Sequence, residues 1–161
     1  MEVKFKYEDI FSQCEQLSSF EARGKVDANG NSRYLDIHIG EVDRLLVDQY
    51  ITQAVINLQE AFSRMIVSTI PNAGVVETTT EDGKTTTEEI PGFTWVMRDD
   101  SRWNGAKAFT KHTAEAIASY VLAQWLSDKL PERVQFYEGL FTSSLAMASK
   151  NLFTKQAPKK K

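Results

Sequence analysis

The most constraining feature of this sequence is a pair of amphipathic patterns that meet at Leu130-Pro131. In both, apolar residues recur at three- and four-residue steps, as on one face of a helix. Proline is best tolerated in the first turn of a helix, so the second helix is predicted to begin at Pro131. Residues 106–155 are therefore predicted to form an antiparallel helical hairpin. The apolar stripes consist of Ala114, Ile117, Ala118, Val121, Leu122 and Trp125, then of Val134, Tyr137, Phe141, Leu145, Ala148 and Leu152.

Length and composition favour one globular domain. A chain of 161 residues, 42% of them hydrophobic, is large enough to bury its own core. The formal net charge of −3 argues against general DNA binding. No apolar run reaches the ~20 residues of a membrane-spanning helix, and Met1–Tyr7 lacks the apolar segment of a secretory signal. The single cysteine, Cys14, is typical of a protein that folds in a reducing cytosol.

The N-terminal half is predicted to contain a short helix, a hairpin and one long helix. Glu8–Ser18 has helical spacing, and Asn29-Gly30 is the strongest two-residue signal for a hairpin turn, here within residues 20–39. Helical spacing then continues over residues 40–69 and stops before Pro71. At ~1.5 Å per residue such a helix is roughly 40 Å long.

A polar segment before the C-terminal hairpin is predicted to form a β-hairpin insertion at about residues 75–97. Asp82-Gly83 is a turn signal, and folding the chain there sets Glu77 against Glu88. Because facing like charges repel and an isolated ribbon is marginal in water, we expect either a mobile loop or a ribbon ordered by another chain. The candidate interaction residues in it are Glu77, Glu81, Asp82, Lys84, Glu88 and Glu89.

No residue pattern indicates an enzyme, a metal site or a cofactor. His38 and His112 are the only histidines, and neither has a cysteine or second histidine at ligand spacing. The glycines match no phosphate-binding fingerprint. The Asp99-Asp100 pair lies beside arginines and is interpreted as a solvated ion-pair cluster rather than an acid–base pair.

The chain ends in Lys159, Lys160 and Lys161, and residues 156–161 are predicted to be a flexible basic tail. Two interpretations stay open for these lysines. They either solubilise the chain or tether it to an acidic or phosphate-bearing partner surface. No aromatic residue alternates with them, so stacking on nucleic-acid bases is not indicated.

Together these elements predict a mainly α fold in a single domain over residues 1–155. The expected architecture is a bundle of one long and two to three shorter helices with a protruding β-hairpin and short strands. Trp125 and Tyr137 lie on the facing stripes of the hairpin and are predicted to pack in one core.

The order of these elements resembles the head–tail connector (adaptor) proteins of tailed bacteriophages. The resemblance extends over most of Glu8–Lys155 and rests on apolar and aromatic spacing rather than on a catalytic signature. The best-matching parts are Glu41-Val42-Asp43-Arg44-Leu45-Leu46 before Tyr50, Ile51 and Ala54, and Tyr120-Val121-Leu122-Ala123-Gln124-Trp125-Leu126 before Pro131, Glu132 and Tyr137.

The resemblance implies a structural virion protein that is made in the bacterial cytoplasm and acts at the head–tail interface, without a membrane. It implies a homo-oligomeric ring, typically of twelve copies, with the portal protein on one side and stopper or tail proteins on the other. Phage DNA would pass through the ring without sequence-specific binding. Two alternatives stay open: another phage neck or tail-completion protein, and a small cytosolic helical regulator that acts as a dimer.

Overall fold

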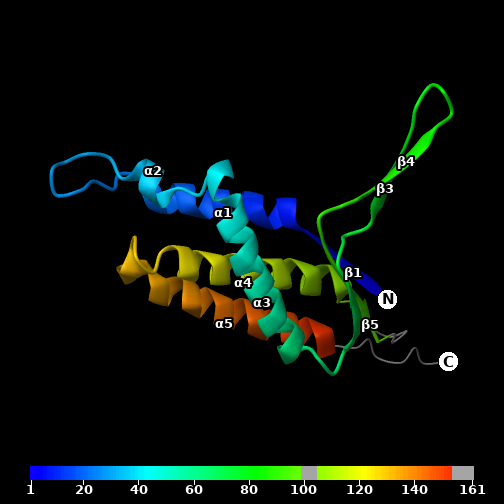
Figure 1. The fold of residues 1–161 in the computed structure, drawn as a ribbon. Coiled ribbons are helices and arrows are strands. Elements are labelled where there is room, and N and C mark those ends of the chain that lie inside the picture. The colour runs from blue at the N-terminus through cyan, green and yellow to red at the C-terminus, as the bar shows by residue number, and fades with distance from the viewer. Residues whose placement is uncertain (99–104, 154–161) are drawn as a thin grey trace.

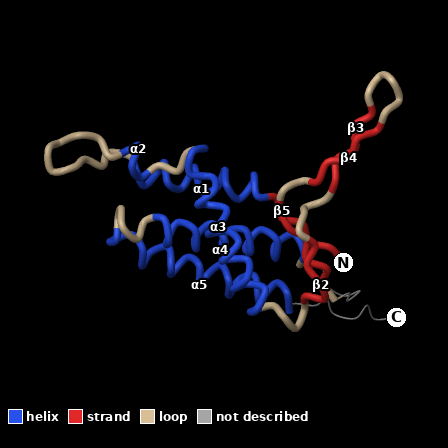
Figure 2. The backbone as a smooth tube through the Cα atoms, viewed as in Figure 1, coloured by secondary structure: helices blue, strands red, loops and turns tan. Residues whose placement is uncertain are grey.

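The protein has a mixed α/β fold in a computed structural model that describes residues 1–98 and 105–153. Helices make up 57% and strands 19% of it, so the expected mainly α bundle is wrong. Helices form the body, and a three-stranded sheet lies at one end (Figures 1 and 2). The elements are β1 Glu2–Lys6, α1 Tyr7–Ala22, α2 Tyr34–Ile37, η1 Glu41–Asp43, α3 Arg44–Ala61, β2 Ile66–Ile70, β3 Val75–Thr79, β4 Thr85–Glu89, β5 Gly92–Met97, α4 Ala106–Trp125 and α5 Pro131–Phe153.

The predicted helical hairpin is confirmed as α4 and α5, which lie side by side in Figure 1. Leu130 is buried at the junction, and α5 begins at Pro131. Trp125 and Tyr137 both belong to the one buried apolar cluster, as expected from their stripes. Each also bonds to the N-terminal part of the chain. The Trp125 indole N–H donates to the Ile37 carbonyl at 2.7 Å, and the Tyr137 hydroxyl donates to the Glu21 carboxylate at 2.9 Å. The hairpin is therefore the platform on which α1, α2 and α3 pack.

Nothing in the sequence pattern predicts a strand at residues 2–6, yet these residues form β1. Val3 and Phe5 are buried while Glu2, Lys4 and Lys6 are exposed, which is the period-two pattern of a half-buried strand. β1 pairs antiparallel with β5, and Phe5 lies opposite Phe93 with ring centroids 4.6 Å apart. Five residues with two apolar positions are too short a pattern to identify without the partner strand.

The predicted long helix over residues 40–69 is wrong at its C-terminal end. α3 ends at Ala61, and the Phe62 carbonyl accepts the N–H groups of Met65 and Ile66 in a turn. Residues Ile66–Ile70 then form β2, which pairs antiparallel with β5. Four of these five residues are β-branched, and such side chains pack well on a sheet. The neighbouring strand decides the conformation here rather than the apolar spacing.

The hairpin predicted around Asn29-Gly30 is reduced to a turn with a single bridge. Val26 pairs with Ser32, but α1 continues to Ala22 and residues Tyr34–Ile37 are helical. The Asp27 carboxylate accepts the N–H groups of Asn29 and Asn31 at 2.8 and 2.9 Å. This local side-chain cap closes the turn without flanking strands.

Some of the remaining predicted elements lie within the described residues and others lie outside them. Within the insertion predicted at about residues 75–97, the last strand is β5, the central strand of the order β1-β5-β2. Asp99-Asp100 and the basic tail with Lys159, Lys160 and Lys161 lie outside the described residues. Within the described ranges, no helix is long and apolar enough to span a bilayer.

Candidate functional site

β3 and β4 pair with each other and form a ribbon that projects from the body (Figures 1 and 2). This ribbon is separate from the sheet of β1, β5 and β2. All ten residues of its two strands are exposed. Residues 75–89 carry five carboxylates and one lysine, so the ribbon is strongly acidic. The candidate interaction residues Glu77, Glu81, Asp82, Lys84, Glu88 and Glu89 all lie on it and are all exposed.

The register of the ribbon differs by one residue from the predicted one. Glu77 lies opposite Thr87, and Glu88 lies opposite Val76, so the expected repulsion between the two glutamates is wrong. The cause is a longer loop: the Thr80 N–H donates to the Lys84 carbonyl at 2.9 Å. Gly83 has a φ of +75° and ends this three-residue loop, a common alternative to the two-residue turn.

The two edge strands of the three-stranded sheet differ in charge. β1 exposes Glu2, Lys4 and Lys6, and charged side chains discourage an edge strand from pairing with another chain. β2 contains no charged residue, and its residues 67–70 are all exposed. Val67 is 64% exposed although it is apolar. Within the part of the chain that the structure describes, β2 is the open edge of the sheet, because it pairs on one side only and has no charged residue.

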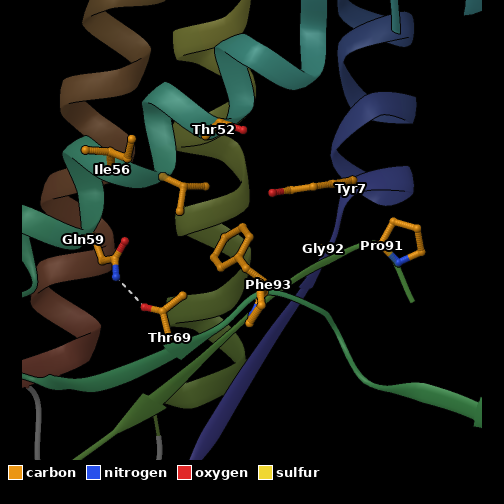
Figure 3. A pocket seen from close by; sticks show the side chains of 10 residues that line it. Tyr7, Thr52, Ile56, Gln59, Thr69, Pro91, Gly92 and Phe93 are labelled. Carbon is orange, nitrogen blue, oxygen red and sulfur yellow. Dashed lines mark hydrogen bonds between the residues drawn. The ribbon is translucent and has the colours of Figure 1, made fainter. Parts of the chain in front are cut away.

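An apolar pocket of about 400 Å³ lies beside β2, between α3 and the sheet (Figure 3). The Thr69 side chain points toward α3, where the Gln59 amide donates a hydrogen bond to its hydroxyl. Ile56 of α3 borders the pocket and is 53% exposed. The pocket is lined by Tyr7, Thr52, Val55, Ile56, Gln59, Thr69, Pro71, Pro91, Gly92 and Phe93.

Two arginines flank the N-terminal end of β2. Arg64 lies in the turn before the strand, and Arg98 follows β5. The Arg98 N–H donates to the Met65 carbonyl at 2.8 Å, which brings both arginines to the same end of the sheet. Both are exposed, so this end of the open edge carries positive charge.

A second exposed apolar region lies where α2, η1 and α3 follow one another. Leu35 is 89% exposed, Val42 95% and Leu45 76%. Sequence reasoning missed these residues as surface candidates because they match helical or strand spacing. For Leu45, the signal that identifies it is its offset from the buried stripe of α3, which runs through Val47 and Ile51. Contiguous exposed apolar surface, rather than single exposed residues, is typical of a site that another chain covers.

A buried ion pair joins the N-terminal helix to the hairpin. Glu21 is 5% exposed and accepts two hydrogen bonds from the Arg133 guanidinium, at 2.9 and 3.0 Å. The Tyr137 hydroxyl donates to the same carboxylate at 2.9 Å. Burial and this carboxylate raise the pKa of Tyr137 above its usual value. Both carboxylate oxygens of Glu21 accept hydrogen bonds from α5, so this cluster fixes α1 against α5.

The residues singled out for possible chemistry have structural surroundings. Cys14 is fully buried, and burial raises the pKa of its thiol to about 12. Such a thiol is a poor nucleophile at neutral pH. His112 lies 2.8 Å from Glu115 on the same helix, and the His38 ring stacks on Tyr34. Within residues 1–98 and 105–153, no group of three or more acidic, histidine or cysteine side chains is placed to hold a metal ion.

Neither a protein-family model nor a curated protein or solved structure matches this chain. The surfaces that carry functional information are therefore the acidic ribbon, the uncharged β2 edge with its pocket, and the exposed aliphatic residues of α2, η1 and α3.

Proposed function

We propose that this chain is a structural virion protein that assembles into a homo-oligomeric ring at the head–tail interface of a tailed phage. The portal protein contacts one side of the ring, stopper or tail proteins contact the other, and DNA passes through the centre. The spacing of residues 41–54 and 120–137 supports this assignment through its resemblance to connector proteins. The role is mechanical, without catalysis or a cofactor.

The observation that carries the proposal is the projecting ribbon. A two-stranded ribbon gains little stability in water, and all ten strand residues of this one are exposed in the single chain. Such an element becomes stable when another chain covers it and supplies partners for its backbone. The ribbon is therefore an arm for contact with a neighbouring subunit or with the portal.

A ring requires two different surfaces on each subunit, because head-to-tail contacts close only when unlike patches meet. The chain offers an acidic arm and, on its body, open apolar surfaces. The net charge of −3 also suits a conduit for DNA, since cationic side chains on phosphates would retard the genome.

Native mass spectrometry and negative-stain imaging of the purified chain test the proposal, alone and mixed with the portal protein encoded in the same genome. One chain has a mass of 18.2 kDa, so a ring of twelve copies has a mass of roughly 220 kDa. Dilution over a hundredfold range controls for non-specific association. A stable dimer in both samples supports the regulatory alternative, and a monomer in both samples shows that the proposal is wrong.

A further inference from the structure

The open β2 edge is uncharged, and the exposed strand β3 of the ribbon begins with two valines that suit such an edge. Assuming the homo-oligomer proposed above, we propose that β2 of one copy pairs antiparallel with β3 from the ribbon of a second copy. The ribbon thereby becomes an additional strand of its neighbour's sheet, in the order β1-β5-β2-β3 across two subunits.

The backbone of β2 is ready for such pairing. Only β5 pairs with it within residues 1–98 and 105–153, and a bulge between Ile66 and Ser68 leaves Ser68–Ile70 as its regular part. Addition of a strand satisfies main-chain donors and acceptors at an exposed edge, while side chains determine which strand is accepted. β1, the other edge, is protected by its charged residues.

The side chains of β3 fit this edge when Val76 lies opposite Thr69. Residues directly opposite each other in an antiparallel pair point to the same face of the sheet. Thr69 points toward α3 (Figure 3), so Val76 of the second copy reaches the apolar pocket beside Ile56. In its own chain Val76 is 49% exposed, so this contact removes apolar surface from water.

The same alignment brings opposite charges together. On the other face it sets Val75 opposite Ile70, and it directs the ribbon tip with Glu81 toward the end of β2 that follows Arg64. Arg98 lies at this end of the sheet as well. Exposed ion pairs contribute little affinity, but they select the antiparallel orientation, because a parallel strand carries the acidic tip away from both arginines.

The alternative strand β4 fits less well. It contains three threonines and two glutamates, so it would present no apolar side chain to the pocket. Pairing of β2 with β2 of a second copy would give another kind of assembly. That contact is symmetric, so it ends at a dimer. Pairing of β3 with β2 joins unlike surfaces, so it is able to repeat from subunit to subunit.

Disulfide cross-linking between singly substituted copies tests the register. Thr69→Cys and Val76→Cys chains with different tags are co-produced, and the assembled protein is treated with diamide. Opposite residues in an antiparallel pair have Cα atoms about 4.5–5.5 Å apart, within the range of a disulfide. Random mixing places both cysteines at about one interface in four, so we expect a covalent dimer containing both tags in up to about half of the chains, and none from either variant alone. Cys14 is buried and gives a low background.

Three matched pairs serve as controls. Lys4→Cys with Val76→Cys probes the charged edge and should not cross-link, and Thr69→Cys with Thr86→Cys probes β4. Ile70→Cys with Val75→Cys probes the same register on the opposite face, in case substitution of Thr69 disturbs the pocket. Native mass spectrometry of each sample shows whether the oligomer has formed.

The outcomes separate this inference from the proposed function. A ring in which both the Thr69–Val76 and the Ile70–Val75 pairs fail to cross-link overturns the strand pairing and leaves the ring intact. Cross-linking through Thr86, or self-cross-linking of Ser68→Cys, overturns it in favour of β4 or of a symmetric dimer. A chain that forms no oligomer, alone or with portal protein, contradicts both proposals together.

Discussion

The α4–α5 hairpin and the β3–β4 ribbon are both antiparallel pairs joined by a short turn, but they differ in what holds them in place. The hairpin is anchored to distant parts of the chain, because Trp125 bonds to Ile37 and Tyr137 bonds to Glu21. The ribbon is held mainly by its own ladder, with contacts such as the 3.3 Å approach of the Thr79 and Thr85 hydroxyls. The hairpin is part of the folded core, whereas the strands of the ribbon are exposed and lie outside the core.

This difference teaches that folding and assembly are separable in this protein. Removal of buried apolar area acts on the free energy of unfolding, at ~25 cal/mol per Å². Changes in a solvent-exposed ribbon remove little such area from the single chain. Substitutions in the hairpin should therefore alter the stability of the subunit, and substitutions in the ribbon should alter only its contacts with other chains.

The largest expected effect is that of Trp125→Ala. The side chain is 5% exposed, and its loss leaves a cavity and an unpaired Ile37 carbonyl. We expect the free energy of unfolding to fall by about 3–5 kcal/mol, measured by urea denaturation. Trp125→Phe keeps most of the ring and should lose less. A melting temperature lowered by only a degree or two would show that the hairpin is not the anchor described here.

Glu21→Gln should have the next largest effect. It removes the charge that two Arg133 hydrogen bonds and the Tyr137 hydroxyl share in a buried site. We expect a loss of about 1.5–3 kcal/mol, typical of hydrogen bonds to a charged group. Glu8→Gln is the matched control, because Glu8 forms an exposed ion pair with Arg44 and its loss should cost less than ~0.5 kcal/mol. Equal effects of the two substitutions contradict the prediction.

A smaller effect of opposite sign is expected for Asp48→Asn. Burial raises the pKa of Asp48, more than the nearby Arg44 lowers it, and one carboxylate oxygen is buried without a partner in the described structure. The folded state therefore binds the proton more tightly than the unfolded state. The contribution of this group to stability is present below its unfolded pKa and is lost as pH rises through the folded pKa.

Replacement by asparagine removes this titration, so the variant should be slightly more stable than the wild type at pH 7. The advantage should shrink as pH falls toward 3.5. Thermal unfolding at both pH values measures the difference. If the stability advantage of Asp48→Asn does not depend on pH, burial of the charged Asp48 carboxylate is not its cause.

The smallest effect on folding is expected for the ribbon tip. Replacement of Glu81–Lys84 by a short Gly-Ser link should leave the free energy of unfolding within ~0.5 kcal/mol of the wild type, because the tip is exposed. The same variant should fail to assemble or to dock. Amide hydrogen exchange should be fast across Thr78–Thr87 in the monomer and slow after assembly. Normal assembly of this variant refutes the role of the ribbon as an arm.

The hairpin and the ribbon also show which parts of the fold can be predicted from the sequence. The hairpin is predictable because each helix contains its whole signal, a repeated apolar stripe and Pro131 at the start of the second. β1 and β2 are not, because each is defined by a partner strand far along the chain: Val3 faces Trp95, and Thr69 faces the same residue from the other side. Local spacing made β2 look like the end of a helix.

The candidate site was predictable in part for the same reason. The acidic residues of the ribbon and its Asp82-Gly83 turn are local features, so they were found, although the loop length and hence the register were not. The open edge and the pocket depend on how α3 packs beside β2. No spacing rule could have identified Thr69 or Ile56 as their lining.

The connection of β1 to β5 has a consequence for how the protein folds during synthesis. The N-terminal amine donates to the Met97 carbonyl across 96 positions of sequence, and the Met97 N–H donates back to the Met1 carbonyl. At roughly 5–20 residues per second, a ribosome takes about 5–20 s to reach the strand that both earlier strands require. Until then Phe5 has no strand to pair with, and α1 extends from an unpaired segment. The sheet therefore closes as one late, long-range event, and it is the slow step to look for when this chain folds.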